Sequence, residues 1–452
     1  MSRITLRQAA AWCGGRVEPQ FEDVAFLGAN NDTRKIQTGQ LFVALEGVRD
    51  GHDFIDAALE KGASAVLCKR CQGAFPALIV EDPRIALGQI AAGYRQALGM
   101  KVVGVTGSVG KSTTKEMIAA VLQGNYHVSK TPANFNNDLG MPMSILAMEE
   151  DTQVAVLEMG MNHFGEIRYL TNIAKPDVAV IINVGTMHVE NLGSRQGILQ
   201  AKLEILEGVG ENGVVCLNAD NDMLQSCDPG RPVTWFGTGE QCAVRGENVR
   251  ETAEGLCFDV AAGQARFPVT LALEGEHYVS DALAAVAVGL AMGVAPDQIR
   301  QRLAEFRNMA GRQEIFTARE CTIIRDCYNA GPESMAAALA VLGKRSGRRI
   351  AVLGDMLELG DHAHDSHIRV GIQAAENADF ILAYGPNAHL VVRGAEEAGN
   401  PNAIAFADRK EMADTLKEIT VPGDTLLFKG SHGMHMELVL EQFLTEDTDT
   451  EE

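Results

Sequence analysis

The stretch Lys101–Glu116, KVVGVTGSVGKSTTKE, decides the architecture of this chain. Its β-branched residues Val102, Val103 and Val105 stand just before a glycine-rich turn, which is typical of a buried strand. Helical periodicity follows from Ser112 to Leu122. A strand, a glycine-rich loop and a helix in this order predict an α/β fold with a mostly parallel sheet.

The glycine-rich loop also predicts a binding site for phosphate groups. Backbone N–H groups and the positive helix end attract an anion, Lys111 adds a charge, and the Ser112 hydroxyl can bind Mg²⁺. A full Walker motif has glycine where this chain has Val105, so the match is to the shorter pattern T-G-x-x-G-K-[ST]. The residues that we expect to hold ATP are Thr106, Gly107, Ser108, Val109, Gly110, Lys111, Ser112 and Thr113. The alternative is an ordinary tight turn that carries an exposed lysine.

Composition limits the possible partners. The 452 residues suggest about three domains, at about 150 residues each. A net charge of −21 argues against nucleic acid or an anionic membrane as a general partner. We find no signal peptide and no run of roughly 18 apolar residues, so we expect no integral membrane contact and a cytoplasmic location. Cys68 and Cys71 form a C-x-x-C motif, but Cys68 ends an apparent strand, so we interpret both as structural.

The pattern of strands and helices changes along the chain. Residues 1–97 mix short strands and helices, whereas residues 98–311 alternate apolar strands with helices, as in VAVLEMG, VAVIINVG and GVVCLNAD. Such alternation favours a parallel sheet with ligands at the carboxyl ends of its strands. Residues 312–444 repeat the alternation and predict a smaller doubly wound unit. The last segment, 445–452, TEDTDTEE, predicts an acidic disordered tail.

Two polar side chains follow strands of the central part. Glu158 ends VAVLEMG, and a carboxylate at a buried strand end costs free energy unless it is paired or metal-bound, so we interpret it as functional. His188 follows VAVIINVGTM, where a hydrogen-bonded structural histidine is an equally good interpretation. The periodicity around Lys202, in ILQAKLEIL, predicts a solvated helical lysine.

The chain resembles the Mur ligase family over nearly its whole length. The motifs, in order, are TGSVGKSTTKE, TPANFNNDLGMP, LEMGMNHFGEI, INVGTMHVENLGSRQGILQAKLEI, MAGRQE, RDCYNAGPESM, VLGDMLELG and LLFKGSHGMHME. The resemblance implies an α/β protein of three domains: a small α/β UDP-sugar domain (1–97), a central P-loop ATPase domain (98–311) and a Rossmann-like domain (312–444).

The resemblance also implies an activity. GDMLELG resembles the branch that adds D-alanyl-D-alanine to UDP-MurNAc-tripeptide. Such an enzyme phosphorylates the terminal carboxylate of the tripeptide with ATP, and the amine of the dipeptide attacks the acyl phosphate. The product would be a cytoplasmic precursor of peptidoglycan.

Site residues follow from the same resemblance. Lys111 would stabilise the transferring phosphoryl group, Ser112 and Glu158 would hold one Mg²⁺, and His188 with a carbamylated Lys202 would serve a second. Other residues match family positions: Asn136 and Asn137 where nucleotide and carboxylate meet, Arg312 at the phosphates, Asp326 and Asn329 at ribose and adenine, and Thr33 and Arg34 at the uridine diphosphate. Alternatives are an asparagine-rich turn for Asn136 and Asn137, and a surface turn for Arg34. The nucleotide site would be complete only when the last domain closes.

The chain departs from the family pattern twice. HYVSDALAA places Tyr278 and Asp281 where asparagines are common, and His432 stands where an arginine is common. These differences leave the contacts to adenine and to an anion at that loop open.

Three rival functions remain. A MurE-like, amino-acid-adding ligase commonly carries D-N-P-R or D-D-P-R, which this chain lacks. Folylpolyglutamate synthase lacks a segment such as NDTRKIQTGQLFVALEG, and a catalytically silent homologue would have lost the phosphate and metal residues. The sequence does not distinguish meso-diaminopimelate from L-lysine in the tripeptide, and we expect a monomer.

Overall fold

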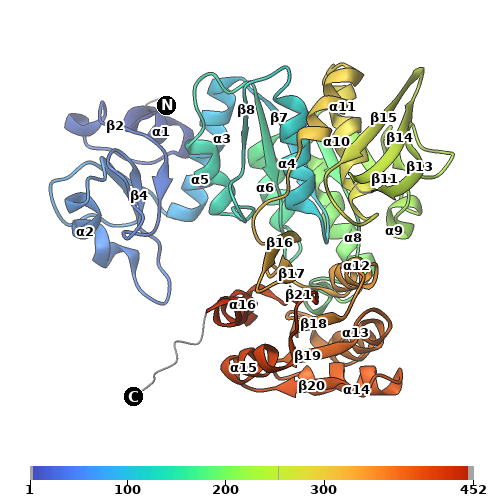
Figure 1. The fold of residues 1–452 in the computed structure, drawn as a ribbon. Helices are drawn as coiled ribbons and strands as arrows, with labels where there is room; N and C mark the ends of the chain where they lie inside the picture. Colours follow the sequence, from blue (N-terminus) through green and yellow to red (C-terminus); the bar gives the residue numbers. More distant parts are fainter. Residues whose placement is uncertain (1–3, 253, 446–452) are drawn as a thin grey trace, which may run out of the picture.

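The computed structural model describes residues 4–252 and 254–445. Figure 1 shows an N-terminal unit in blue, a central unit from cyan to yellow and a C-terminal unit in orange and red, each with its own sheet. The predicted α/β class is confirmed. The acidic tail expected at 445–452 lies outside the described residues except for Thr445. Within the described ranges, no helix is both long and apolar enough to cross a bilayer.

The N-terminal unit is built on a small parallel sheet. Its strands, in spatial order, are β3 (Ala29–Asn30), β4 (Leu41–Val43), β5 (Ala65–Cys68) and β6 (Ala77–Ile79). A short antiparallel pair, β1 (Ile4–Thr5) and β2 (Ala25–Phe26), and the helices α1 (Leu6–Cys13), α2 (Ile55–Glu60) and α3 (Pro83–Leu98) complete it. Cys68 is buried at the end of β5, and burial raises the pKa of its thiol to about 12, as suits a structural cysteine.

The central unit contains a nine-stranded sheet. Its spatial order is β15 (Ala265–Leu271), β14 (Gly255–Ala262), β13 (Val244–Thr252), β12 (Thr234–Gly237), β11 (Val214–Asn218), β10 (Val178–Ile181), β7 (Lys101–Thr106), β9 (Val154–Glu158) and β8 (Val128–Lys130). From β8 to β13 the strands are parallel, and β14 and β15 extend the sheet as antiparallel strands. The parallel part therefore brings the carboxyl ends of β7, β9 and β10 to one edge.

Helices cover both faces of this sheet. They are α4 (Lys111–Leu122), α5 (Gly140–Leu146), α6 (Glu166–Ala174), α7 (Val189–Leu192), α8 (Arg195–Leu203), α9 (Asp222–Gln225), α10 (Tyr278–Ala291) and α11 (Pro296–Glu305). Helices α4 and α10 share a core with one face of the sheet. The other face shares a continuous core with α3, α6 and the sheet of the N-terminal unit, so apolar burial joins these two units.

The C-terminal unit has a six-stranded sheet. Its order is β16 (Glu314–Ala318), β17 (Cys321–Asp326), β21 (Thr425–Lys429), β18 (Arg349–Gly354), β19 (Phe380–Tyr384) and β20 (Ala403–Phe406). Only β16 is antiparallel to its neighbour. One face packs against α12 (Pro332–Gly343), α13 (Ala363–Asn377) and α14 (Ala388–Glu397), and the other against α15 (Arg409–Ile419) and α16 (Met436–Leu444).

Candidate active site

A cavity of about 470 Å³ lies between the central and C-terminal units. The central unit contributes the loop after β7, Glu158 at the end of β9 and His188 beyond β10, and the C-terminal unit contributes Arg312, Asp326 and Asn329. Parallel sheets place ligands at the carboxyl ends of their strands, and here the ends of two such sheets line one cavity. Residues that are far apart in the sequence are thus brought together.

The phosphate loop has the geometry that the sequence predicts. Strand β7 ends at Thr106 and helix α4 begins at Lys111. Gly110 has a positive φ of 83°, and a Cβ there would lie 2.7 Å from Asp281 Oδ1, so a larger residue would not fit. Residues 108–113 line the cavity, whereas Thr106 and Gly107 are buried behind it.

Asn183 fixes the shape of this loop. Its Oδ1 accepts hydrogen bonds from the backbone N–H groups of Ser108, at 2.9 Å, and Val109, at 3.0 Å. Its Nδ2 donates to the Val109 carbonyl at 3.0 Å. Sequence reasoning did not single out Asn183, although it stands directly beyond β10, where ligand-binding side chains are expected.

Lys111 is folded back onto its own loop. Its Nζ donates to the carbonyls of Gly107, at 2.9 Å, and Ser108, at 3.2 Å. Burial lowers the pKa of Lys111, and the neighbouring Glu158 carboxylate acts in the opposite direction. A phosphate group near this loop would stabilise the charged form of the lysine.

Of the two carboxylate oxygens of Glu158, one accepts a hydrogen bond and the other does not. Its Oε1 accepts a 2.9 Å hydrogen bond from Asn136 Nδ2. Its Oε2 is buried without a hydrogen bond, with Lys115 Nζ 3.8 Å away. Ser112 Oγ accepts from Arg312 at 2.8 Å. A carboxylate oxygen and a hydroxyl beside a phosphate loop are suitable ligands for Mg²⁺.

His188 stands at the start of α7 with a positive φ of 64°. Its Nδ1 lies 2.9 Å from Glu358 Oε2 of the C-terminal unit, but the nitrogen is buried without an aligned hydrogen bond. A metal ion at this nitrogen would have to displace Glu358 or share its carboxylate. This contact also joins the central and C-terminal units across the cavity.

Lys202 is buried, so the solvated lysine that periodicity predicted is wrong. Its side chain is 2% exposed and has no hydrogen-bond or ion-pair partner in the described part of the chain. Burial lowers the pKa of Lys202 well below its usual range, and the charge on Lys111 adds to the effect. The signal was present in the sequence, because Lys202 stands four residues after buried Ile198 on the same face of α8.

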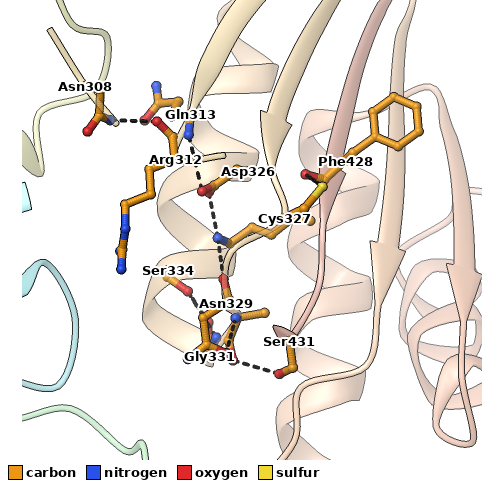
Figure 2. A network of polar contacts seen from close by, with 12 residues as sticks. Asn308, Arg312, Gln313, Asp326, Cys327, Asn329, Gly331, Ser334, Phe428 and Ser431 are labelled. Atoms are coloured by element: carbon orange, nitrogen blue, oxygen red, sulfur yellow. Dashed lines mark hydrogen bonds and ion pairs between the residues drawn. The ribbon is translucent and has the colours of Figure 1, made fainter. Parts of the chain in front are cut away.

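Polar contacts order the C-terminal side of the cavity, as Figure 2 shows. The Arg312 guanidinium lies 4.0 Å from the centre of the Tyr328 ring. Asp326 Oδ2 accepts from buried Lys429 Nζ at 2.6 Å, and the same nitrogen donates to the Asn329 carbonyl at 3.0 Å. Contacts between the ends of strands β17 and β21 therefore orient Asp326 so that it faces the cavity.

The three residues at which the chain departs from the family pattern all line the same cavity. Tyr278 Oη accepts a 2.8 Å hydrogen bond from Asn308, and burial raises the pKa of this phenol. Asp281 Oδ1 accepts a 2.7 Å bond from the Thr114 hydroxyl, and burial raises the pKa of its carboxyl to about 7. His432 lines the cavity from an exposed position. The carboxylate at position 281 thus contacts the loop and its helix.

Three predicted substrate residues lie outside this cavity. Asn137 Oδ1 accepts a hydrogen bond, at 2.7 Å, from the backbone N–H of Gly140, the first residue of α5. Thr33 and Arg34 belong to the N-terminal unit, where Arg34 pairs with Asp32 at 2.8 Å and is 84% exposed, as in a surface turn. Their binding roles stay predictions. Asn136, in contrast, lines the cavity.

Comparisons with known proteins agree along the whole chain. Three family descriptions match: the Mur ligase family catalytic domain over residues 25–95, the Mur ligase middle domain over 105–289 and the Mur ligase glutamate ligase domain over 311–432. A UDP-N-acetylmuramoyl-tripeptide–D-alanyl-D-alanine ligase of Bacillus subtilis is 38% identical and covers 98% of this chain and 99% of its own length.

Solved structures give the same result. A crystal structure of MurF from Acinetobacter baumannii has a TM-score of 0.91 at 32% identity, covering 99% of this chain and 100% of that one. MurF ligase from Thermotoga maritima in complex with ADP has a TM-score of 0.81 at 31% identity, covering 92% and 97%.

Proposed function

This chain belongs to the Mur ligase family, and we propose that it joins D-alanyl-D-alanine to UDP-MurNAc-tripeptide with ATP, as a step in peptidoglycan precursor synthesis. One observation carries the proposal: the phosphate loop, Glu158 and His188 line a single cavity, and each of these two side chains has a buried atom without a hydrogen bond. Lys202 does not line the cavity, but it is buried close enough to Lys111 for the two charges to interact. A catalytically silent homologue would have no need to keep these residues. The identity of the two substrates is inferred from the names of the relatives.

The need for ATP follows from the chemistry of the substrate. A carboxylate is a poor electrophile and offers a poor leaving group. Transfer of the γ-phosphoryl group of ATP to a carboxylate oxygen gives an acyl phosphate and ADP. The dipeptide amine then forms the amide bond at the acyl carbon, the C–O bond to phosphate breaks, and phosphate leaves while the amine loses a proton. Each turnover therefore releases one ADP and one phosphate.

We assign the binding of the nucleotide to both sides of the cavity. The loop 106–113 binds the phosphates with its backbone N–H groups, and Lys111 moves from its own loop carbonyls to the transferring group. Arg312, already stacked on Tyr328, donates to a phosphate in place of Ser112. Asp326 and Asn329 bind the ribose and adenine. Because these residues come from two units, closure of the units excludes water from the acyl phosphate.

Three residues of the cavity, together with the buried Lys202, fit two Mg²⁺ ions. Ser112 and Glu158 would hold one ion, because Glu158 Oε2 has no hydrogen bond and its ion-pair partner Lys115 Nζ is 3.8 Å away. His188 and Lys202 would hold or support the second. Bound Mg²⁺ neutralises phosphate charge during transfer. Lys202 suits this role as a carbamate, since burial lowers its pKa and so favours the neutral amine, which can add to CO₂ and release a proton to give an anion.

The remaining predicted residues contact the UDP-linked substrate. Thr33 and Arg34 bind the diphosphate, where the guanidinium of Arg34 exchanges Asp32 for a phosphate oxygen. Asn136 and Asn137 orient the tripeptide carboxylate. Asn136 is bonded to Glu158, so it couples the carboxylate site to the metal site.

The test is ATP-dependent phosphate release with UDP-MurNAc-tripeptide, in its diaminopimelate and its lysine form, with and without D-Ala-D-Ala. We expect turnover only with the dipeptide, and a product heavier by one dipeptide minus water. Turnover with UDP-MurNAc-dipeptide and a diamino acid would instead indicate the amino-acid-adding activity. Gel filtration of the active protein tests the expected monomer.

A further inference from the structure

A second groove of about 490 Å³ lies beside the nucleotide cavity. It is formed between the loop before α7 and the start of α8 on the central unit and helices α12 and α13 on the C-terminal unit. Small apolar groups of Val189, Pro332 and Ala336 line it. Its volume is in the range of about 300–1,000 Å³ that is usual for small-molecule sites.

Glu333, in the first turn of α12, lines both the groove and the nucleotide cavity. Its Oε1 accepts from the Thr186 backbone N–H and from the Thr186 hydroxyl, each at 2.9 Å. Its Oε2 is buried and has no hydrogen-bond partner in the described part of the chain. One oxygen thus fixes the side chain, and the other lacks a donor. An ammonium group would supply that donor with a charge-assisted bond.

Arg369 on α13 and His362 just before it also line the groove, where they offer positive or donor groups. Arg369 is exposed and forms no close ion pair in the described part of the chain. Asp365, one turn earlier on α13, lines the same groove and interacts with the charge of Arg369, so a ligand carboxylate competes with Asp365 for this guanidinium. Arg195, the other arginine of the groove, is already bound to Asp222 at 2.5 and 2.7 Å. Arg369 is therefore the guanidinium of this groove that is available to a ligand carboxylate.

We propose that this groove binds the acceptor dipeptide, with its ammonium group on Glu333 and its carboxylate on Arg369; this inference rests on the proposed function. An extended dipeptide is about 7 Å long. Its amine end then lies at the carboxylate that the groove shares with the nucleotide cavity, where the acyl phosphate forms. The apolar side chains of the groove accept the two alanine methyl groups.

The tripeptide arm of the UDP-linked substrate is the competing occupant. Figure 1 shows the N-terminal unit on the left of the central unit, and helices α12 and α13 in the C-terminal unit below it. Among the described residues, the lining of the groove comes from the central and C-terminal units alone, and the N-terminal unit contributes none of it.

The experiment measures kcat and KM for each of the three substrates in wild type, Arg369→Met and Glu333→Gln. Glutamine keeps an oxygen for Thr186, so the second variant preserves the contact that holds the side chain. Arg393→Met and Glu376→Gln, on the outer surfaces of α14 and α13, are the matched controls. Thermal melting checks that all variants are folded.

We expect Arg369→Met to raise the KM for D-Ala-D-Ala about tenfold, and to leave the KM values for ATP and the UDP-linked substrate unchanged. D-alanyl-D-alaninamide lacks the carboxylate, so the penalty of Arg369→Met should disappear with this substrate. Glu333→Gln should raise the dipeptide KM by a similar factor, whereas it should not weaken inhibition by N-acetyl-D-Ala-D-Ala, which lacks the ammonium group.

Two results would overturn the inference alone. One is an active wild type together with variants whose KM for the dipeptide equals that of the wild type. The other is a raised KM for the UDP-linked substrate in the variants, which would indicate that the tripeptide arm binds in the groove. A wild type without dipeptide-dependent phosphate release would overturn the proposed function together with the inference.

Discussion

Asp281 gives the sharpest prediction about this site. It is 4% exposed, accepts a hydrogen bond from Thr114 and lies against Gly110 of the phosphate loop. Burial raises the pKa of its carboxyl from the usual 3.8 to about 7. Asp281→Asn keeps the shape of the side chain and an oxygen for Thr114, but it removes the ionisable group.

The magnitude follows from the difference between the folded and unfolded pKa values. Below about pH 4 the carboxyl is protonated in both states, so its ionisation has no effect on stability. Between about pH 4 and pH 7 only the unfolded state releases the proton, so the stability of the wild type falls as the pH rises. Above pH 7 the full loss persists, at ~4 kcal/mol for three pKa units of 1.36 kcal/mol each. Because structural relaxation and water penetration reduce such penalties, we expect the ionisation of Asp281 to lower the free energy of unfolding by ~2–4 kcal/mol.

The assay is urea unfolding at pH 4 and pH 8.5 in a Trp12→Phe background. Trp235 on β12 is then the only tryptophan and reports on the central unit. The advantage of Asp281→Asn over its parent should be ~2–4 kcal/mol larger at pH 8.5 than at pH 4. An equal difference at the two pH values would refute the raised pKa.

Other predictions concern the nucleotide and metal residues. Arg312→Lys should raise the KM for ATP about tenfold, because lysine cannot both stack on Tyr328 and donate a planar pair of bonds; an unchanged KM would contradict this role. Lys111→Met should lower kcat about a thousandfold with the fold intact, and near-normal turnover would exclude it from phosphoryl transfer. With ¹³C-bicarbonate near pH 8, wild type should show a carbamate carbon signal by NMR that Lys202→Arg lacks; no such signal in wild type would rule out the modification.

Local sequence patterns predicted the central strands and the phosphate loop because those features depend on neighbouring residues. The runs around Val103, Leu157 and Val180 formed the expected strands β7, β9 and β10, and α4 begins one residue before the predicted helix. The antiparallel strands β14 and β15 were not predicted. Their hairpins depend on pairing with the rest of the sheet, which a local pattern does not specify.

The site was less accessible from sequence than the fold. Lys111, Ser112 and Glu158 could be proposed from residue type and position alone. Asn183, Glu333 and the contact between His188 and Glu358 depend on how distant segments meet, which residue spacing does not contain. The role predicted for Lys202 rests on the resemblance to a family, because the local periodicity indicated a solvated lysine.

The most direct test of the account is the stoichiometry of the complete reaction. With ATP, Mg²⁺, UDP-MurNAc-tripeptide and D-Ala-D-Ala, we predict one phosphate released for each molecule of UDP-MurNAc-pentapeptide detected by mass spectrometry. Omission of the dipeptide should stop both the release of phosphate and the formation of the pentapeptide. Phosphate release that is independent of the dipeptide, or no pentapeptide product with either form of the tripeptide, would contradict the assignment.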